Sequence, residues 1–194
     1  AISDFGSAET LQYLLARDSI HGAMEDAVEL DGNYLIVKDQ RVRVISGGDP
    51  GTIPWDALQA DVVVDATGRF LTREKLALHL ESGAKRVFLT RNPKNEIDRY
   101  VIPGINESSI SLSDKIISTT SSTTQVLALM VKMLDEAFGL KRAMMTTVHA
   151  YTADQPLADV AGADLRRSRS AVENIIPNTT QSPALVEKIL PQYK

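Results

Sequence analysis

The run "ADVVVDATG", residues 60–68, constrains the fold more than any other stretch of the sequence. Three consecutive valines followed by a turn of small residues are typical of a strand covered on both faces of a parallel sheet. The next segment, "LTREKLALHLESGAKRVFLT", predicts a helix capped by Thr72 and ended by Gly83, then a second buried strand at residues 86–89. A strand, a helix and a strand in this order predict a βαβ unit, and therefore an α/β fold.

The rest of the chain continues the alternation of helices and strands. A helix capped by Ser7 is expected in residues 7–19, and a hairpin is expected to turn near Asp39 and Gln40. Further on, the pattern predicts strands in "RYVIPGI" and "KIIST", a helix from about Thr123 to Phe138, and a strand in "AMMTTVH", residues 143–149. Residues 150–170 are the least regular stretch.

Composition narrows the classes of function. With 43% hydrophobic residues and 24% charged residues, 194 residues can form a sizeable core. The net charge of −4 argues against a nucleic acid or an anionic membrane as the main partner. No apolar run approaches the roughly 20 residues of a membrane helix, and the first residues lack the basic start of a signal peptide, so a cytoplasmic location is expected. The chain has no cysteine, so it has neither a disulfide nor a thiolate nucleophile.

Six segments, in order, carry a resemblance to a known family. They are "AISDF…AETLQYLLARDSIHG", "DATGRFLTREKLALHLESGAKRV", "PGIN", "STTSSTTQ", "MTTVHAYTADQ" and "DLRRSRSAVENIIP". Together they resemble the phosphorylating glyceraldehyde-3-phosphate dehydrogenases and their erythrose-4-phosphate dehydrogenase relatives. The resemblance implies a partial Rossmann-like parallel sheet, as the remnant of an NAD-binding domain in residues 1–121. Residues 122–194 would then be the first part of an α+β catalytic domain.

The resemblance also implies a set of site residues. Ser122 stands where the family has its nucleophilic cysteine, and His149 stands in the position of the general base. The phosphate of a small phosphorylated aldehyde would be bound by Thr123, Thr152, Thr180, Arg167 and Arg169. NAD or NADP would be held by Asp4, Thr67, Gly68 and Thr90. No metal site is expected.

Several residues depart from the family pattern. A serine hydroxyl is far less acidic than a thiol, whose pKa is about 8.5, so attack on an aldehyde should be nearly abolished. Gln181 replaces a glycine of the phosphate-binding segment, and Gly48 replaces an arginine beside the adenine. The chain also starts after the family's glycine-rich dinucleotide loop and stops before its last strands. These departures predict a catalytically impaired dehydrogenase homologue in which cofactor binding is weak or lost.

Other interpretations stay open at this point. The chain could be a non-catalytic assembly or regulatory module that uses residues 150–170 as a subunit contact, or an active dehydrogenase blocked by an engineered Cys-to-Ser change. Ester hydrolysis by Ser122 and His149 is a further alternative. Without the resemblance, the Ser/Thr-rich turn would be a helix cap and His149 a structural histidine. The resemblance also implies that the chain forms a homo-oligomer.

Overall fold

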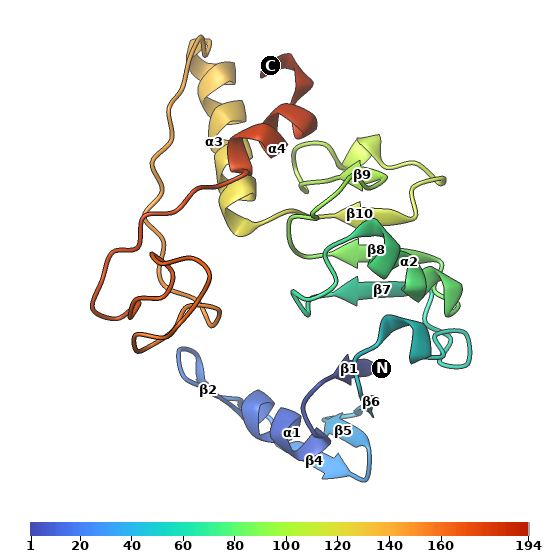
Figure 1. Ribbon diagram of the computed structural model, residues 1–194. Helices are drawn as coiled ribbons and strands as arrows, with labels where there is room; N and C mark the ends of the chain where they lie inside the picture. Colours follow the sequence, from blue (N-terminus) through green and yellow to red (C-terminus); the bar gives the residue numbers. More distant parts are fainter. Residues whose placement is uncertain (194) are drawn as a thin grey trace. The chain divides into compact units, whose positions relative to one another are not determined.

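The βαβ unit expected from the sequence is present in the computed structural model, which describes residues 1–193. Strands β7 (Val62–Asp65) and β8 (Arg86–Leu89) pair in parallel, and helix α2 (Arg73–Glu81) connects them. Strands β10 (Ile116–Ser118) and β9 (Arg99–Tyr100) complete a four-stranded parallel sheet in the order β7-β8-β10-β9 (Figure 1). The expected α/β fold with a Rossmann-like parallel sheet is therefore confirmed.

The core of this sheet lies where α2 packs against it. Leu76 of α2 is fully buried together with Val87, Leu89 and Ile116 of the strands. Thr72 caps α2 by accepting a hydrogen bond from the amide of Lys75. The expectation that β7 is covered on both faces is wrong, because only its alternate residues are buried. Val62 and Val64 are 50% and 62% exposed, whereas Val63 packs with Ile53, Trp55 and Ala84.

A second, mixed sheet lies at the start of the chain. Strand β1 (Ile2–Asp4) pairs in parallel with β6 (Gln40–Ser46), and β6 continues antiparallel to β5 (Tyr34–Val37) and β4 (Val28–Asp31). The predicted hairpin is confirmed, since Val37 pairs with Gln40. Helix α1 (Ala8–Ala16), capped by Ser7 as expected, packs on this sheet, and strands β2 (Arg17–Asp18) and β3 (Gly22–Ala23) form a short ribbon after it.

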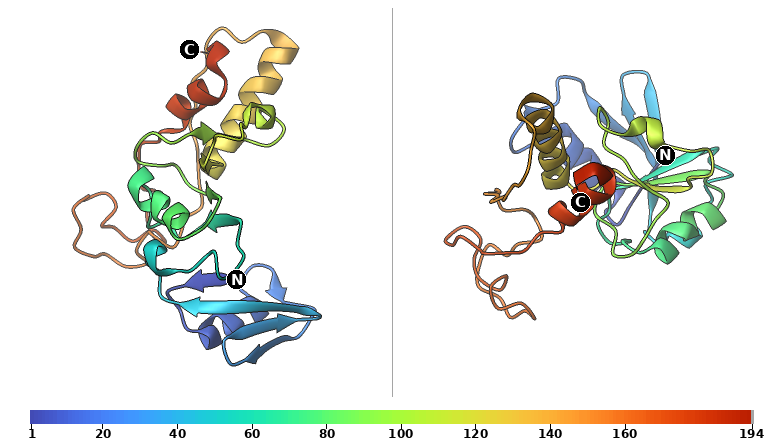
Figure 2. Two further views of the ribbon diagram at one scale, coloured as in Figure 1. Left: turned by 90° about the vertical axis from the view of Figure 1, so that its right-hand side faces the viewer. Right: turned by 90° about the horizontal axis from the view of Figure 1, so that it is seen from above.

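The chain divides into a first compact unit, Ala1–Ser121, and a second unit that begins at Ser122. In the second unit, helix α3 (Ser122–Phe138) lies beside helix α4 (Ser182–Ile189), which is followed by the short 3-10 helix η3 (Pro191–Tyr193) (Figure 2). Two further 3-10 turns, η1 (Pro50–Thr52) and η2 (Glu107–Ser109), belong to the first unit. Helix α3 begins one residue before the predicted start.

The segment between α3 and α4 differs from the expectation. Residues 143–149 were expected to form a strand, and the structure shows no strand there. A strand needs a neighbouring strand to receive its backbone hydrogen bonds, and no strand lies among the described residues of the second unit. Met144 and Val148 are consequently 95% exposed. The strand expected in "RYVIPGI" is also shorter than predicted, because only Arg99 and Tyr100 pair. Within residues 1–193, no helix is both long and apolar enough to cross a bilayer.

Candidate functional site

Three of the predicted cofactor residues lie at the carboxyl ends of β7 and β8, and Asp65 connects two of them. The Asp65 Oδ1 atom accepts hydrogen bonds from the Thr67 amide at 2.9 Å and from the Thr67 hydroxyl at 2.7 Å. The carbonyl oxygen of Asp65 accepts from the amide of Thr90 at 3.1 Å and from its hydroxyl at 3.3 Å. Gly68 follows with φ of +68°, a conformation that favours glycine. Asp65 thus fixes the geometry of this edge.

Two buried side chains stand behind Asp65. The indole Nε1 of Trp55 donates to His79 Nδ1 at 3.0 Å, and His79 Nε2 lies 3.5 Å from Asp65 Oδ2. All three residues are at most 5% exposed. Burial is the largest influence on the pKa of Asp65 and raises it, but hydrogen bonds from His79 and Thr67 together outweigh burial and hold that pKa below its ordinary value. No sequence motif indicated this cluster, although His79 follows the buried Leu76 at helical spacing.

The fourth predicted cofactor residue, Asp4, ends strand β1. Its Oδ1 atom accepts a hydrogen bond from the amide of Gly6 at 2.7 Å. The next residue, Phe5, brings the two sheets together, because its ring lies 6.4 Å from that of Phe70 and the Arg69 guanidinium stacks over it at 3.8 Å. A Cβ atom at Gly48 would lie only 1.9 Å from the Phe5 ring. Phe5 therefore occupies the space in which a side chain at position 48 would begin.

Asp4 and Phe5 have the chemistry that the nucleoside part of a dinucleotide requires. The Asp4 carboxylate accepts hydrogen bonds and therefore suits ribose hydroxyls. The Phe5 ring is 44% exposed and offers a flat surface beside that carboxylate. The residues that are present thus fit a ribose and a planar base.

The predicted nucleophile position lies at the first turn of α3. Ser122 is the first residue of this helix and its side chain is exposed. The hydroxyl of buried Thr124 donates to Ser182 Oγ at 3.0 Å, and Ser182 Oγ lies 3.0 Å from Thr180 Oγ1. The beginnings of α3 and α4 therefore meet, and Thr180 is brought to the turn that contains Thr123. The dipoles of two helix N-termini favour an anion there.

Two residues near these helix starts depart from ordinary geometry or capping. Thr120 has φ of +63°, which is rare for a β-branched residue, and its fully buried hydroxyl has no hydrogen-bond partner among the described residues. Gln181 occupies the N-cap position of α4 and makes no side-chain capping bond. The turn before Ser122 is thus strained, and α4 begins without a side-chain cap.

His149 and the remaining phosphate candidates lie on the irregular segment. The His149 side chain is exposed, and its Nδ1 lies 2.5 Å from the carbonyl oxygen of Ala150. A carbonyl only accepts, so in the neutral imidazole Nδ1 carries the proton and Nε2 has the lone pair that a general base requires. The structure shows no hydrogen bond between Ser122 and His149, and their pairing stays a prediction.

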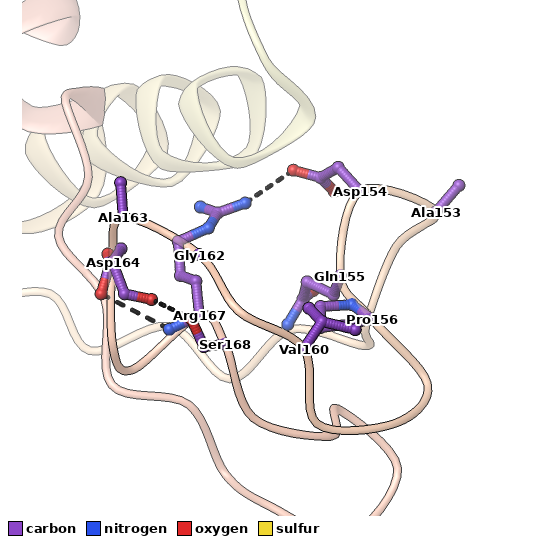
Figure 3. A pocket seen from close by; sticks show the side chains of 10 residues that line it. All are labelled: Ala153, Asp154, Gln155, Pro156, Val160, Gly162, Ala163, Asp164, Arg167 and Ser168. Atoms are coloured by element: carbon purple, nitrogen blue, oxygen red, sulfur yellow. Dashed lines mark hydrogen bonds and ion pairs between the residues drawn. The ribbon is translucent and has the colours of Figure 1, made fainter.

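Aspartates partner the two predicted arginines. Asp154 accepts a hydrogen bond from the Thr152 hydroxyl. It also pairs with Arg167 at 2.7 Å (Figure 3). The hydrogen bond from Thr152 lowers the pKa of Asp154 the most. Burial raises this pKa, but the Arg167 bond lowers it again, so that it stays below its usual value. Asp154 and Arg167 line an open cavity of about 410 Å³. Arg169 pairs separately with Asp159 at 2.6 Å. Thr152 and Arg167 are therefore brought together, whereas Arg169 pairs elsewhere.

Comparison with known proteins gives the same family along most of the chain. Residues 1–73 match the model of the "Glyceraldehyde 3-phosphate dehydrogenase, NAD binding domain", and residues 121–194 match that of the C-terminal domain. Among curated relatives, glyceraldehyde-3-phosphate dehydrogenase of Geobacillus stearothermophilus is 43% identical over 100% of this chain and 58% of the relative. Glyceraldehyde-3-phosphate dehydrogenase 1 of Bacillus subtilis strain 168 is 41% identical with the same coverage. The chain therefore spans less than two thirds of the length of these relatives.

Proposed function

This chain belongs to the glyceraldehyde-3-phosphate dehydrogenase family, and we propose that it is a catalytically impaired member in which Ser122 replaces the nucleophilic cysteine. One observation carries the proposal: Ser122 is exposed as the first residue of the 17-residue helix α3. The position is suited to stabilising an anion, and a thiol at such a site ionises readily. A serine hydroxyl stays protonated there, because its pKa is too high for the stabilisation at a helix N-terminus to bring it near neutral pH.

The surroundings support a family-type phosphate and base arrangement. Thr123 and Thr180 lie at two helix N-termini that meet, where a phosphate group of an aldehyde substrate is favoured. Thr152 and Arg167 form a second group around Asp154. The free Nε2 of His149 would take the proton of the attacking hydroxyl or thiol. Oxidation of a small phosphorylated aldehyde is thus the ancestral chemistry that we assign to this site.

The cofactor of the family is NAD, since residues 1–73 match its NAD-binding domain. We expect this chain to bind NAD or NADP weakly. Gly48 offers no side chain to flank an adenine, and Phe5 fills the space in which one would begin. Calorimetric titration measures this, and saturation at low micromolar NAD would contradict weak binding.

The Ser122→Cys variant tests the nucleophile position. The new thiol should alkylate with iodoacetamide at pH 7 faster than a model-peptide thiol, because the helix dipole and a nearby imidazole lower its pKa below about 8.5. Ser109→Cys is the matched control, since Ser109 is exposed and ends a three-residue 3-10 turn instead of beginning a helix. Equal alkylation rates for the two variants would show that position 122 is not the nucleophile site.

NADH production separates impairment from an engineered block. We expect no aldehyde oxidation from the unaltered chain and none from Ser122→Cys, because Gln181 and Gly48 still depart from the family pattern. If Ser122→Cys alone restored turnover, the serine would be a block in an otherwise working enzyme.

A second candidate function, assembly, is supported by the exposed apolar face of α3. The members of this face are Val126, Leu129, Met130, Met133 and Leu134. We expect a second copy of the chain to cover it, so the protein should form dimers or larger homo-oligomers. Light scattering at micromolar concentration tests this, and a clean monomer would contradict it. The expected cytoplasmic location stays a prediction.

A further inference from the structure

We propose that Asp65 is a positioning residue that makes the cofactor edge accept hydrogen bonds, and that His79 and Trp55 hold Asp65 in this role. The inference extends the proposed function, because it states which chemical groups of the cofactor this edge can take. It rests on the proposed function only for the identity of the ligand. The arrangement of protons inside the cluster can be measured without any ligand.

The positions of the protons follow from Trp55, the first of the three residues in contact. The indole N–H of Trp55 can only donate, so His79 Nδ1 must accept at their 3.0 Å separation. A neutral imidazole that accepts at Nδ1 carries its proton on Nε2. That N–H faces Asp65 Oδ2 at 3.5 Å, and neither of these two buried atoms has a hydrogen-bond partner among residues 1–193, so each is the nearest polar group available to the other. Trp55 therefore selects the tautomer of His79 that donates toward Asp65.

Asp65 then sets the direction of the two threonine hydroxyls. A carboxylate oxygen and a carbonyl oxygen only accept, so the Thr67 hydroxyl donates to Asp65 Oδ1 and the Thr90 hydroxyl donates to the Asp65 carbonyl. The Thr67 oxygen also accepts from the amide of Arg69 at 3.2 Å. Both hydroxyl protons are thus directed inward, and both oxygens present only lone pairs to a ligand.

The Thr67 and Thr90 hydroxyl oxygens, which can only accept, select ligand groups that donate. Ribose hydroxyls and the amide of a nicotinamide carry such protons, whereas a fully ionised phosphate carries none. Thr67 is exposed and can reach a ligand directly. We therefore assign the Thr67 and Thr90 hydroxyl oxygens to the hydroxyl- or amide-bearing part of the dinucleotide.

Nitrogen-15 NMR of the imidazole in the ligand-free chain tests the cluster itself. We expect the wild-type chain to show His79 protonated at Nε2. In the double variant Trp55→Phe/Asp65→Asn, the indole donor is gone and a side-chain amide N–H can face His79 Nε2 in place of a carboxylate oxygen. His79 should therefore switch to the tautomer protonated at Nδ1. In Asp65→Asn alone, Trp55 still prevents that switch. A wild-type chain protonated at Nδ1, or a double variant that keeps the Nε2 proton, would overturn the proposal.

Ligand titration followed at the Thr67 and Thr90 amides tests the polarity of the edge. NAD should shift both resonances. In Asp65→Asn, we expect the side-chain amide to turn its oxygen to the buried His79 N–H and its own N–H to Thr67, which reverses the Thr67 hydroxyl and leaves the Thr67 backbone amide without its acceptor. The affinity for NAD should fall by about tenfold, as expected for one lost hydrogen bond. In the double variant, affinity should return to within about threefold of that of Trp55→Phe alone, because the asparagine oxygen can face Thr67 again.

The control is Asp61→Asn, an exposed aspartate before the same strand that pairs with Lys85 and should leave NAD affinity unchanged. Unchanged affinity in Asp65→Asn, or additive losses in the double variant, would each refute the role of Asp65 in directing the Thr67 hydroxyl. A wild-type chain with the expected His79 tautomer but no response to millimolar NAD would refute the ligand assignment and the cofactor part of the proposed function, while the proton arrangement would stand.

Discussion

Each of the two units of the chain contains a helix with apolar residues at helical spacing, but the two helices are buried to different degrees. In the first unit, α2 has only nine residues, yet Leu76 and His79 are enclosed by strands and loops. In the second unit, α3 has 17 residues, and only Thr124, Ala128 and Val131 are buried. The difference shows that an apolar helix face is not sufficient for a core, because burial depends on what the rest of the unit places against that face.

The candidate site residues divide in the same way. In the first unit, Thr67 and Thr90 are tied to one buried aspartate whose own contacts are buried. In the second unit, His149 and Arg169 are exposed on the irregular segment, and their partners are exposed as well. Order in the cofactor half should therefore come from a packed scaffold, whereas order in the catalytic half should depend on a ligand or on a covering surface.

Native-state hydrogen exchange should show the largest effect of this difference. Amides of Val87 and Ile117 lie in the parallel sheet and should exchange at least about a thousandfold more slowly than the amides of residues 143–149, since strand openings cost far more than loop fluctuations. Mass spectrometry of peptides from the two regions measures the ratio. Similar protection in both regions would mean that residues 143–149 are as well packed as the sheet.

The sequence predicted the first unit better than the second for a physical reason. Residues 60–89 contain a strand, a cap, a helix and a strand that contact each other, so local signals coincide with the final contacts. Residues 143–149 have an equally apolar pattern, but a strand is completed only by pairing, which no local signal reports. The Trp55–His79–Asp65 cluster was missed because it joins three elements through side chains that look unremarkable one at a time.

Matched leucine truncations should give the next largest effect. Leu76→Ala removes a fully buried side chain and should lower the free energy of unfolding of the first unit by about 3 kcal/mol. Leu129→Ala removes a side chain that is 49% exposed and should cost less than about 1 kcal/mol. Urea unfolding followed by fluorescence of Trp55, the one tryptophan of the chain, measures the first, and circular dichroism measures the second. Equal costs would contradict the contrast between the units.

Acid should destabilise the first unit through Asp98. Burial raises the pKa of this carboxyl, but the amides of Ile116 and Lys115 and the Arg73 guanidinium outweigh burial and lower it. The unfolded chain therefore binds the proton more tightly, so this stabilisation is complete above the ordinary value of about 3.9 and is lost as pH falls below it. Between pH 7 and pH 3, the urea midpoint should fall less in Asp98→Asn than in the wild-type chain. An identical fall in both would exclude Asp98 as a cause.

The smallest expected effect is a difference in coupling energy between two Arg–Asp ion pairs, one in each unit. Arg99 donates two hydrogen bonds to Asp114, which is buried, whereas Arg169 and Asp159 are both exposed. Double-mutant cycles with alanine should give a coupling energy of up to about 1 kcal/mol for the first pair and below about 0.5 kcal/mol for the second, because water and side-chain entropy weaken an exposed pair. Raising the salt concentration should reduce the second coupling more than the first. If the Arg169–Asp159 coupling were the larger of the two, the irregular segment would be held by its charges as firmly as the sheet is held by its core.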